Sequence, residues 1–95
     1  MAAYVIADVD IADPEKYKEY TAHTPESIAA HGGRFIARGG RCEVLEGEWE
    51  PGRVVVIEFP SMDAALGWYR SDDYQELAKI RQSASTAKIL VVEGV

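Results

Sequence analysis

One strand-to-helix unit, residues 53–75, constrains the fold of this chain more than any other feature. Arg53–Phe59 holds three consecutive valines and an isoleucine, which favour a buried β-strand. Pro60 ends the strand because proline cannot donate to the ladder, and Ser61 is a preferred N-cap residue. The sequence therefore predicts a central strand that leads directly into a helix, with the rest of the chain packed around this pair.

The remaining elements follow from periodicity and from capping residues. Asp13 followed by Pro14 predicts the start of a first helix, and Ser71 predicts the start of a further helical segment. Pro25 falls inside the first helix, so we expect two short helices that meet at an angle. The helical segment after Ser71 presents a predicted apolar stripe of Tyr74, Leu77, Ile80 and Ala84. Further strands are predicted at 3–9, 34–38 and 87–92.

This order of elements predicts a fold class and an assembly. Strand, helix, strand, strand, helix, strand fits a single α+β domain over residues 1–95, with a four-stranded antiparallel sheet and helices on one face. Several strands are apolar on both sides, so the second sheet face also needs a cover. We expect a second copy of the chain to supply it, giving a homodimer.

Charge and cysteine content exclude several classes of protein. A net charge of −6 argues against nucleic acid and against an anionic membrane surface as partners. Cys42 is the single cysteine, which excludes an internal disulfide and fits a reducing cytoplasm. We identify no signal peptide and no apolar run near the length of a membrane span, so the prediction is a cytoplasmic protein.

Motifs along nearly the whole chain carry a resemblance to a known family. They are Asp13-Pro14, the GGRFIARGG segment at 32–40, LEG at 45–47, RVVVIEFPS at 53–61 and WYRSDDYQ at 68–75, with Arg81 and a closing VEGV. The chain resembles the family called domain of unknown function 1330, in the dimeric α+β-barrel superfamily. The resemblance implies a ferredoxin-like βαββαβ fold in which two sheets form a dimeric α+β barrel. It implies no particular reaction; relatives in the superfamily include cofactor-independent monooxygenases, isomerase-like proteins and haem-binding enzymes.

Aromatic side chains form the first candidate site. Two tyrosines of the first helix and an aromatic group in the second helical region can line a pocket for a flat ligand, with hydroxyls that orient it. The same residues can equally form an ordinary aromatic core. The candidates are Tyr17, Tyr20, Trp68, Tyr69 and Tyr74.

Arginines form the second candidate site, which consists of Arg34, Arg38, Arg41 and Arg53. Arg34 and Arg38 are expected to share one strand face with Ile36, and a guanidinium suits a carboxylate or phosphate ligand. The alternative is a set of ion pairs with the glutamates at positions 43, 46, 48 and 50. Arg38 is the preferred ligand-binding candidate, and Arg81 is included with it.

Two residues are candidates for proton transfer. Glu58 shares a strand face with Val54 and Val56, so it must be paired, protonated or at the rim. Paired with Arg38 or Arg81 it would be structural, whereas alone in a pocket it would be a candidate general base. Histidine is a common residue type for proton transfer, and His23 lies close to Tyr20 in the first predicted helix. It is otherwise a surface histidine.

The sequence offers no dedicated metal site and no dinucleotide-binding motif. The two histidines, His23 and His31, lie eight residues apart with Pro25 between them, and the glycine pairs flank a strand instead of opening a helix. We therefore expect no cofactor.

Two functional hypotheses remain open. In the first, the protein binds a small aromatic or carboxylated metabolite between sheet and helices, as a cofactor-free oxygenase or isomerase in its enzymatic version. Glu58 or His23 would then move a proton, Tyr20 would orient the substrate and Arg38 would hold an anion. In the second, the protein is a non-catalytic dimeric module, structural or stress-related. A binder requires a polar-lined cavity of roughly 300 Å³ or more, whereas a module has the same side chains packed together.

Overall fold

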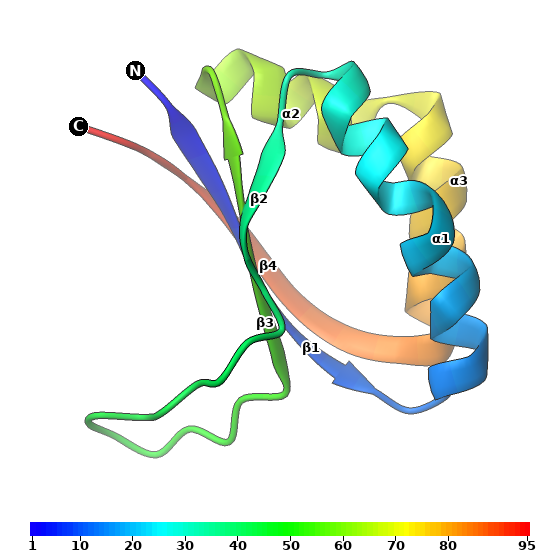
Figure 1. Cartoon of the computed structure of the whole chain (residues 1–95), viewed down its shortest axis with the longest axis vertical. Coiled ribbons are helices and arrows are strands. Elements are labelled where there is room, and N and C mark those ends of the chain that lie inside the picture. Colours follow the sequence, from blue (N-terminus) through cyan, green and yellow to red (C-terminus); the bar gives the residue numbers. More distant parts are fainter.

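A computed structural model describes residues 1–95 and confirms the predicted α+β fold. The strands form one antiparallel sheet in the order β2-β3-β1-β4, and the second crossover contains two helices (Figure 1). The elements along the chain are β1 (Ala3–Ile11), α1 (Pro14–Ala30), β2 (Arg34–Arg38), β3 (Arg53–Phe59), α2 (Met62–Arg70), α3 (Asp72–Ala84) and β4 (Ser85–Glu93).

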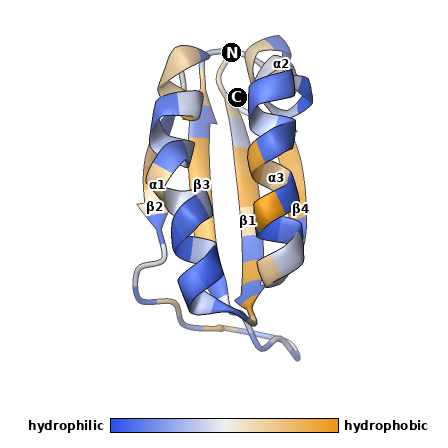
Figure 2. Ribbon diagram, turned by 90° about the vertical axis from the view of Figure 1, so that its right-hand side faces the viewer, coloured by the Kyte–Doolittle hydropathy of each residue, from blue (hydrophilic) through white to orange (hydrophobic).

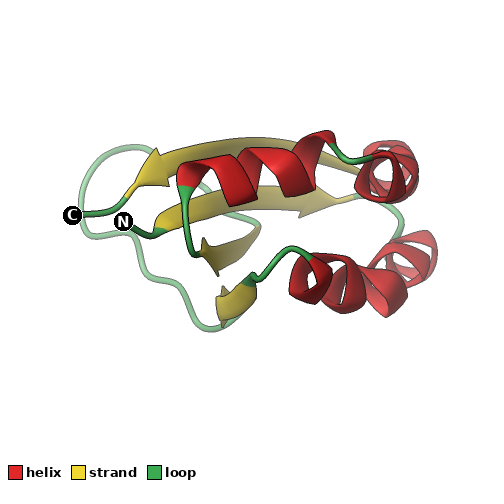
Figure 3. Cartoon of the chain, turned by 90° about the horizontal axis from the view of Figure 1, so that it is seen from above, coloured by secondary structure: helices red, strands yellow, loops and turns green.

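All three helices lie on one face of the sheet, and the opposite face is bare (Figures 1 and 3). The outward sides of α1 and α3 are mostly hydrophilic, as expected of helices that bury only one stripe (Figure 2). None of the helices combines the length and the apolar character that a membrane span requires.

The predicted helix starts are confirmed by their capping geometry. The side chains of Asp13, Ser61 and Ser71 each accept a hydrogen bond from the backbone amide three residues later. This satisfies one of the amides that the first turn of a helix leaves without a partner. At the other end of α1, Gly32 has a φ of +80°, the left-handed conformation that favours glycine.

The prediction that Pro25 divides the first helix is wrong. Helix α1 is one continuous element with Pro25 inside it. Residues on both sides of the proline hold the last turns in place: Thr24 and Ile28 are buried, and the Ser27 hydroxyl donates to Asp73 of α3. Packing against the core and α3 therefore outweighs the loss of one helical hydrogen bond.

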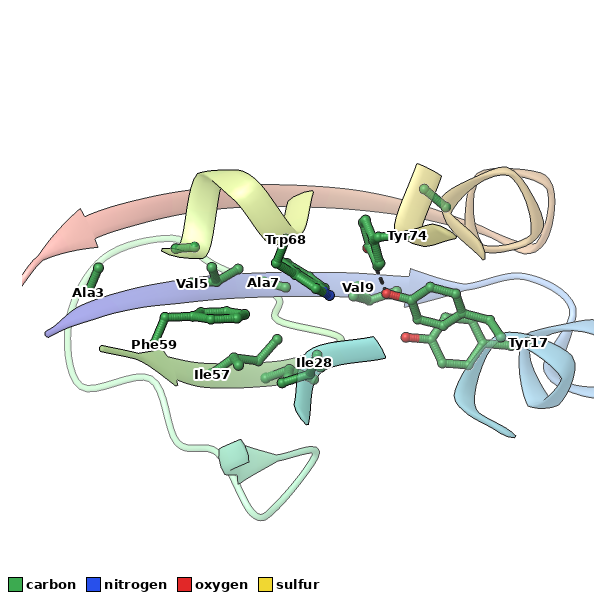
Figure 4. Close-up of a cluster of buried hydrophobic side chains, with 14 of the residues drawn as sticks. Ala3, Val5, Ala7, Val9, Tyr17, Ile28, Ile57, Phe59, Trp68 and Tyr74 are labelled. Atoms are coloured by element: carbon green, nitrogen blue, oxygen red, sulfur yellow. Dashed lines mark hydrogen bonds between the residues drawn. The ribbon is translucent and has the colours of Figure 1, made fainter. Parts of the chain in front are cut away.

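The core lies between the helices and the covered sheet face. Every second residue of β1 points into it, as do Val55, Ile57 and Phe59 of β3. The Trp68 ring lies 5.3 Å from that of Phe59 and 4.0 Å from that of Tyr74, measured between centroids (Figure 4). These three fully buried rings join β3 to both α2 and α3.

A β-bulge in β2 overturns the prediction that Arg34 and Arg38 share one face. The pairing of β2 with β3 shifts between Phe35 and Ala37. Arg34 stands opposite Glu58 on the bare face, while Arg38 stands opposite Val55 on the covered face. One extra residue reverses the alternation of side chains, so the two arginines point to opposite sides.

The long loop between β2 and β3 projects towards the bare side of the sheet (Figure 1). Asp8 of β1 anchors its end: the Asp8 carboxylate accepts hydrogen bonds from Trp49 Nε1 and from the Gly52 amide, both at 2.8 Å. Both bonds lower the pKa of the Asp8 carboxyl group, and the bond from Trp49 has the larger effect.

Replacing Phe59 by alanine should destabilise the protein by about 3–5 kcal/mol, because a fully buried ring is lost and a cavity remains. Urea unfolding followed by circular dichroism measures this. Val95→Ala, at a fully exposed position, is the matched control and should change little. A Phe59→Ala variant as stable as the wild type would contradict the observed packing of the core.

Replacing Asp8 by asparagine should destabilise the protein at neutral pH, and the difference from wild type should disappear in acid. A pKa that is lower in the folded state contributes stability above the unfolded value of about 4, and this is lost as the pH falls through the folded value. Urea midpoints of both proteins over a pH series test this. Asp10→Asn, an exposed neighbour on β1, is the control. A difference that stays constant down to low pH would mean that the Asp8 charge is not what anchors the loop.

Candidate functional site

A cavity of about 40 Å³ lies between the covered sheet face and helices α1 and α3. Apolar residues of all four strands form its floor. The polar and aromatic side chains around it are Tyr17, Tyr20, Thr21, Thr24, Trp68, Tyr74, Phe35, Arg38, Arg53 and Arg81. No carboxylate and no histidine is among its lining residues.

Helical periodicity brings the tyrosines of this cavity together. Tyr17, Tyr20 and Thr24 lie on the buried side of α1 at three- and four-residue steps, and Tyr74 faces them from α3. The Tyr20 and Tyr74 hydroxyl oxygens are 2.7 Å apart, the hydrogen bond dashed in Figure 4. The Tyr17 ring lies 5.4 Å from that of Tyr20.

The predicted apolar stripe of α3 is displaced from the observed one. Tyr74 and Ala84 are buried as expected, but Ala78 and Arg81 accompany them in place of Leu77 and Ile80. The steps from 74 to 78 and 81 follow the helix repeat closely, so the position of Arg81 is set by geometry and not by its polarity. Leu77 and Ile80 are half-buried beside the core.

Arg81 is a buried cation without a carboxylate partner. Its side chain is 5% exposed, and it forms no ion pair. Two buried side-chain polar atoms in the protein have no hydrogen-bond partner, Arg81 Nε and Trp68 Nε1, and both residues line this cavity. Unpartnered buried donors are costly, so these two nitrogens are available to bind an acceptor that enters the cavity.

Two further arginines lie at the outer end of the cavity, each against an aromatic ring. The Arg38 guanidinium lies 4.4 Å from the Phe35 ring centroid, and that of Arg53 lies 5.6 Å from the Tyr17 centroid. Arg53 also donates a 3.2 Å hydrogen bond to the Tyr17 hydroxyl. Neither arginine forms an ion pair, so all three cavity arginines lack a carboxylate in a protein of net charge −6.

Protonation follows from burial and from these neighbours. Burial and the adjacent Tyr74 raise the pKa of the Tyr20 phenol far above its usual value, so Tyr20 stays neutral and does not act as a base. Burial lowers the pKa of the Arg81 guanidinium, but Tyr74 and Tyr20 more than offset this, and Arg81 stays charged. The cavity therefore carries positive charge and hydrogen-bond donors.

The structure brings six of the nine predicted site residues to this cavity: Tyr17, Tyr20, Arg38, Trp68, Tyr74 and Arg81. Tyr69 instead lines two shallow grooves beside β4. His23 lies in a surface depression between α1 and α3. Glu58 is on the bare sheet face, where its carboxylate accepts a 2.8 Å hydrogen bond from Arg34 Nε.

Two corrections concern the acid–base candidates and the size of the cavity. Glu58 is paired, but with Arg34 and not with Arg38 or Arg81, because the bulge in β2 turns Arg38 away from it. The cavity volume of 40 Å³ is far below the roughly 300 Å³ expected of a metabolite site. A bound metabolite would have to displace the side chains at the outer end.

Phe35 was not predicted as a site residue, and Arg53 was predicted only as one member of the arginine group. The signal for Arg53 is present in the sequence: it precedes Phe59 by six residues on one strand, so both point to the same face. Phe35 pairs with the buried Ile57 ahead of the bulge, so the regular alternation of β2 already places it on the covered face, opposite to Arg34. The structure gathers no group of three or more histidine, cysteine, aspartate or glutamate side chains suited to a metal ion.

The fold and the cavity define a class: a ferredoxin-like α+β domain with an arginine-lined cavity between sheet and helices. Comparison with family models gives the particular family. Residues 2–95 match the model "Domain of unknown function (DUF1330)", and the chain belongs to this family. No curated protein matches the sequence.

Solved structures show the same fold at low sequence identity. A protein of unknown function from Rhodopseudomonas palustris, RPA0582, has a TM-score of 0.77 at 21% identity, covering 99% of this chain and 82% of that one. SnoaB, a cofactor-independent oxygenase from Streptomyces nogalater, has a TM-score of 0.66 at 14% identity, covering 99% and 93%. A dimeric protein of unknown function and ferredoxin-like fold from Bacteroides fragilis has a TM-score of 0.60 at 16% identity, covering 98% and 96%.

Proposed function

We propose that this protein binds a small, flat anion, an aromatic or carboxylated metabolite, in the cavity between sheet and helices. The observation that carries the proposal is the buried charge of Arg81, which has no counter-ion in the protein. A buried charge without a partner is strongly unfavourable, and an anionic ligand would supply the partner. Trp68 Nε1 is a second free donor for the same ligand.

The walls of the cavity favour a flat ligand that brings its own negative charge. Tyr17, Tyr20, Trp68 and Tyr74 provide aromatic faces. No lining side chain is a general base at neutral pH, because the carboxylates and histidines lie elsewhere and burial keeps Tyr20 protonated. A ligand that enters already ionised needs no such base.

The ligand would enter where Arg38 and Arg53 now lie. Arg38 is exposed and Arg53 half-buried, and both are long side chains that rest on aromatic rings. A cation–π contact at an exposed site contributes only about 0.5–1 kcal/mol, so a ligand can displace these side chains at small cost. Once displaced, either guanidinium can pair with a second anionic group on the ligand.

The likeness to a cofactor-independent oxygenase supports a cofactor-free oxygenase or isomerase as the enzymatic version of this function. In that version Arg81 would stabilise negative charge on the substrate, with Tyr20 orienting it and Arg38 holding a further anion. His23 and Glu58 lie outside the cavity, so the geometry gives them no proton-transfer step there. The exposed Cys42 thiol supports a reducing, cytoplasmic setting.

A non-catalytic dimeric module is the second candidate, and the small volume of the cavity favours it. In this case the arginines and aromatic rings would serve packing alone. The two functions differ in what Arg81 does for stability. A structural arginine stabilises the fold, whereas an arginine kept for a ligand costs stability until the ligand binds.

Replacing Arg81 by methionine should leave the stability unchanged or raise it, and should abolish ligand retention. Methionine fills a similar volume without a charge to desolvate. Native mass spectrometry of gently purified protein tests retention, since a bound anion appears as a discrete extra mass, and thermal unfolding tests stability. Arg70→Met, at an exposed arginine outside the cavity, is the matched control. A large loss of stability in Arg81→Met, with no adduct in the wild type, would favour the non-catalytic module.

We also propose that the bare sheet face is the interface of a homodimer. This face carries Ile6, Val56, Leu90 and Val92, of which Leu90 and Val92 remain 56% and 46% exposed in one chain. Apolar side chains of this size on a central face are normally covered. The dimeric ferredoxin-like relative from Bacteroides fragilis supports a second copy as the cover.

A Leu90→Lys variant should elute as a monomer, because the interface would bury an unpaired ammonium group in each subunit. Size-exclusion chromatography with light scattering at micromolar concentration measures the mass. Leu45→Lys, in the exposed loop, is the matched control and should leave the wild-type dimer intact. A stable wild-type monomer at that concentration would remove the argument for a covered sheet.

A further inference from the structure

Arg81 lines a second space besides the cavity. A groove of about 370 Å³ runs between the C-terminal end of α3 and the edge strand β4. Its lining residues are Tyr69, Arg81, Gln82, Ser85, Thr86, Ala87 and Ile89. Arg81 and Ile89 are the two residues that it shares with the cavity.

The Arg81 side chain therefore stands between the two spaces. Tyr20 and Tyr74 adjoin its guanidinium on the cavity side, whereas Tyr69 lines the groove and not the cavity. Although Arg81 borders a groove at the surface, it is only 5% exposed. Its Nε atom is buried and has no hydrogen-bond partner. A shift of this one side chain would bring the guanidinium into contact with whatever occupies the groove.

The chemistry of the groove suits an anion. It has no carboxylate among its lining residues, and its polar side chains are hydroxyls, an amide and the guanidinium itself. The Ser85 hydroxyl already donates to the Arg81 carbonyl oxygen, and the other groups can donate a hydrogen bond to an oxyanion. The groove is open without displacement of Arg38 or Arg53, because neither of them lines it.

We propose that this groove is a second entrance to the site, through which a small carboxylate of the size of formate or acetate reaches Arg81 from the β4 side. The proposal rests on the proposed function, because the same guanidinium anchors the anion of the main ligand. One positive charge serves both spaces, so an anion in the groove and an anionic ligand in the cavity compete for it. The groove thus gives small carboxylates in solution a means to weaken binding of the main ligand.

Formate titration of ¹⁵N-labelled protein tests the second entrance by NMR. The Arg81 Nε–H resonance is the readout, assigned by its absence in Arg81→Met, and the Trp68 Nε1–H resonance reports on the cavity. We expect formate to shift the Arg81 resonance in a saturable way. Formate that leaves this resonance unmoved in the wild type would overturn the proposal.

Variants that fill one space at a time show which route formate takes. Ala87→Phe fills the groove, and Gln82→Phe at its exposed rim does so where folding is at less risk. Thr21→Phe, which fills the cavity side, is the matched control. The proposal requires that the groove variants abolish the shift and that Thr21→Phe retains it; the reverse result would mean a single entrance past Arg38 and Arg53.

The outcome is separable from that of the proposed function. Formate binding at Arg81, together with no adduct in native mass spectrometry and a large loss of stability in Arg81→Met, would contradict the metabolite in the cavity and leave the groove as an anion site. A retained adduct, together with no effect of formate on the Arg81 resonance, would contradict the second entrance and leave the proposed function intact.

Discussion

The packing of the Trp68 ring against those of Phe59 and Tyr74 is the contact on which the rest of the structure depends. It joins the central strand β3 to α2 and, across the break at Ser71, to α3. Large buried rings contribute more apolar area than any other side chains in a chain of 95 residues, which has little core to spare. The position of Tyr74 in turn fixes that of Arg81, two helical turns later on the same side of α3.

The core is thus divided into an apolar part and a polar part. At the Phe59 end the rings pack closely, and at the other end the tyrosine hydroxyls and Arg81 replace apolar groups. A protein under selection for stability alone would fill that end with methionine or leucine. The proposal of a bound anion rests on the unpartnered nitrogens of Arg81 and Trp68.

Much of the site was predictable from local patterns. Helical spacing places Tyr17 and Tyr20 on one side of α1, and the aromatic group of the second helical region is a pattern typical of side chains that pack on a sheet. Two predictions were wrong because a shift of one residue changes which side chains point into the core. The bulge at Ile36 separates Arg34 from Arg38, and a stripe assigned by hydrophobicity placed Ile80 in the core instead of Arg81. Both errors have one cause, because polarity is a weak guide where tertiary geometry sets which side chain points inward.

The sequence by itself determined the elements, their order and the family. Capping residues, alternation in the strands and the motifs along the chain are local signals. The helix starts predicted at Asp13, Ser61 and Ser71 are confirmed, and so is the family. Only the tertiary structure decided which charges meet. It paired Glu58 with Arg34, kept His23 at the surface and enclosed Arg81 without a partner. Ion pairing and burial depend on distances between residues far apart in the chain, and these distances follow from strand register and helix packing, which local patterns do not encode.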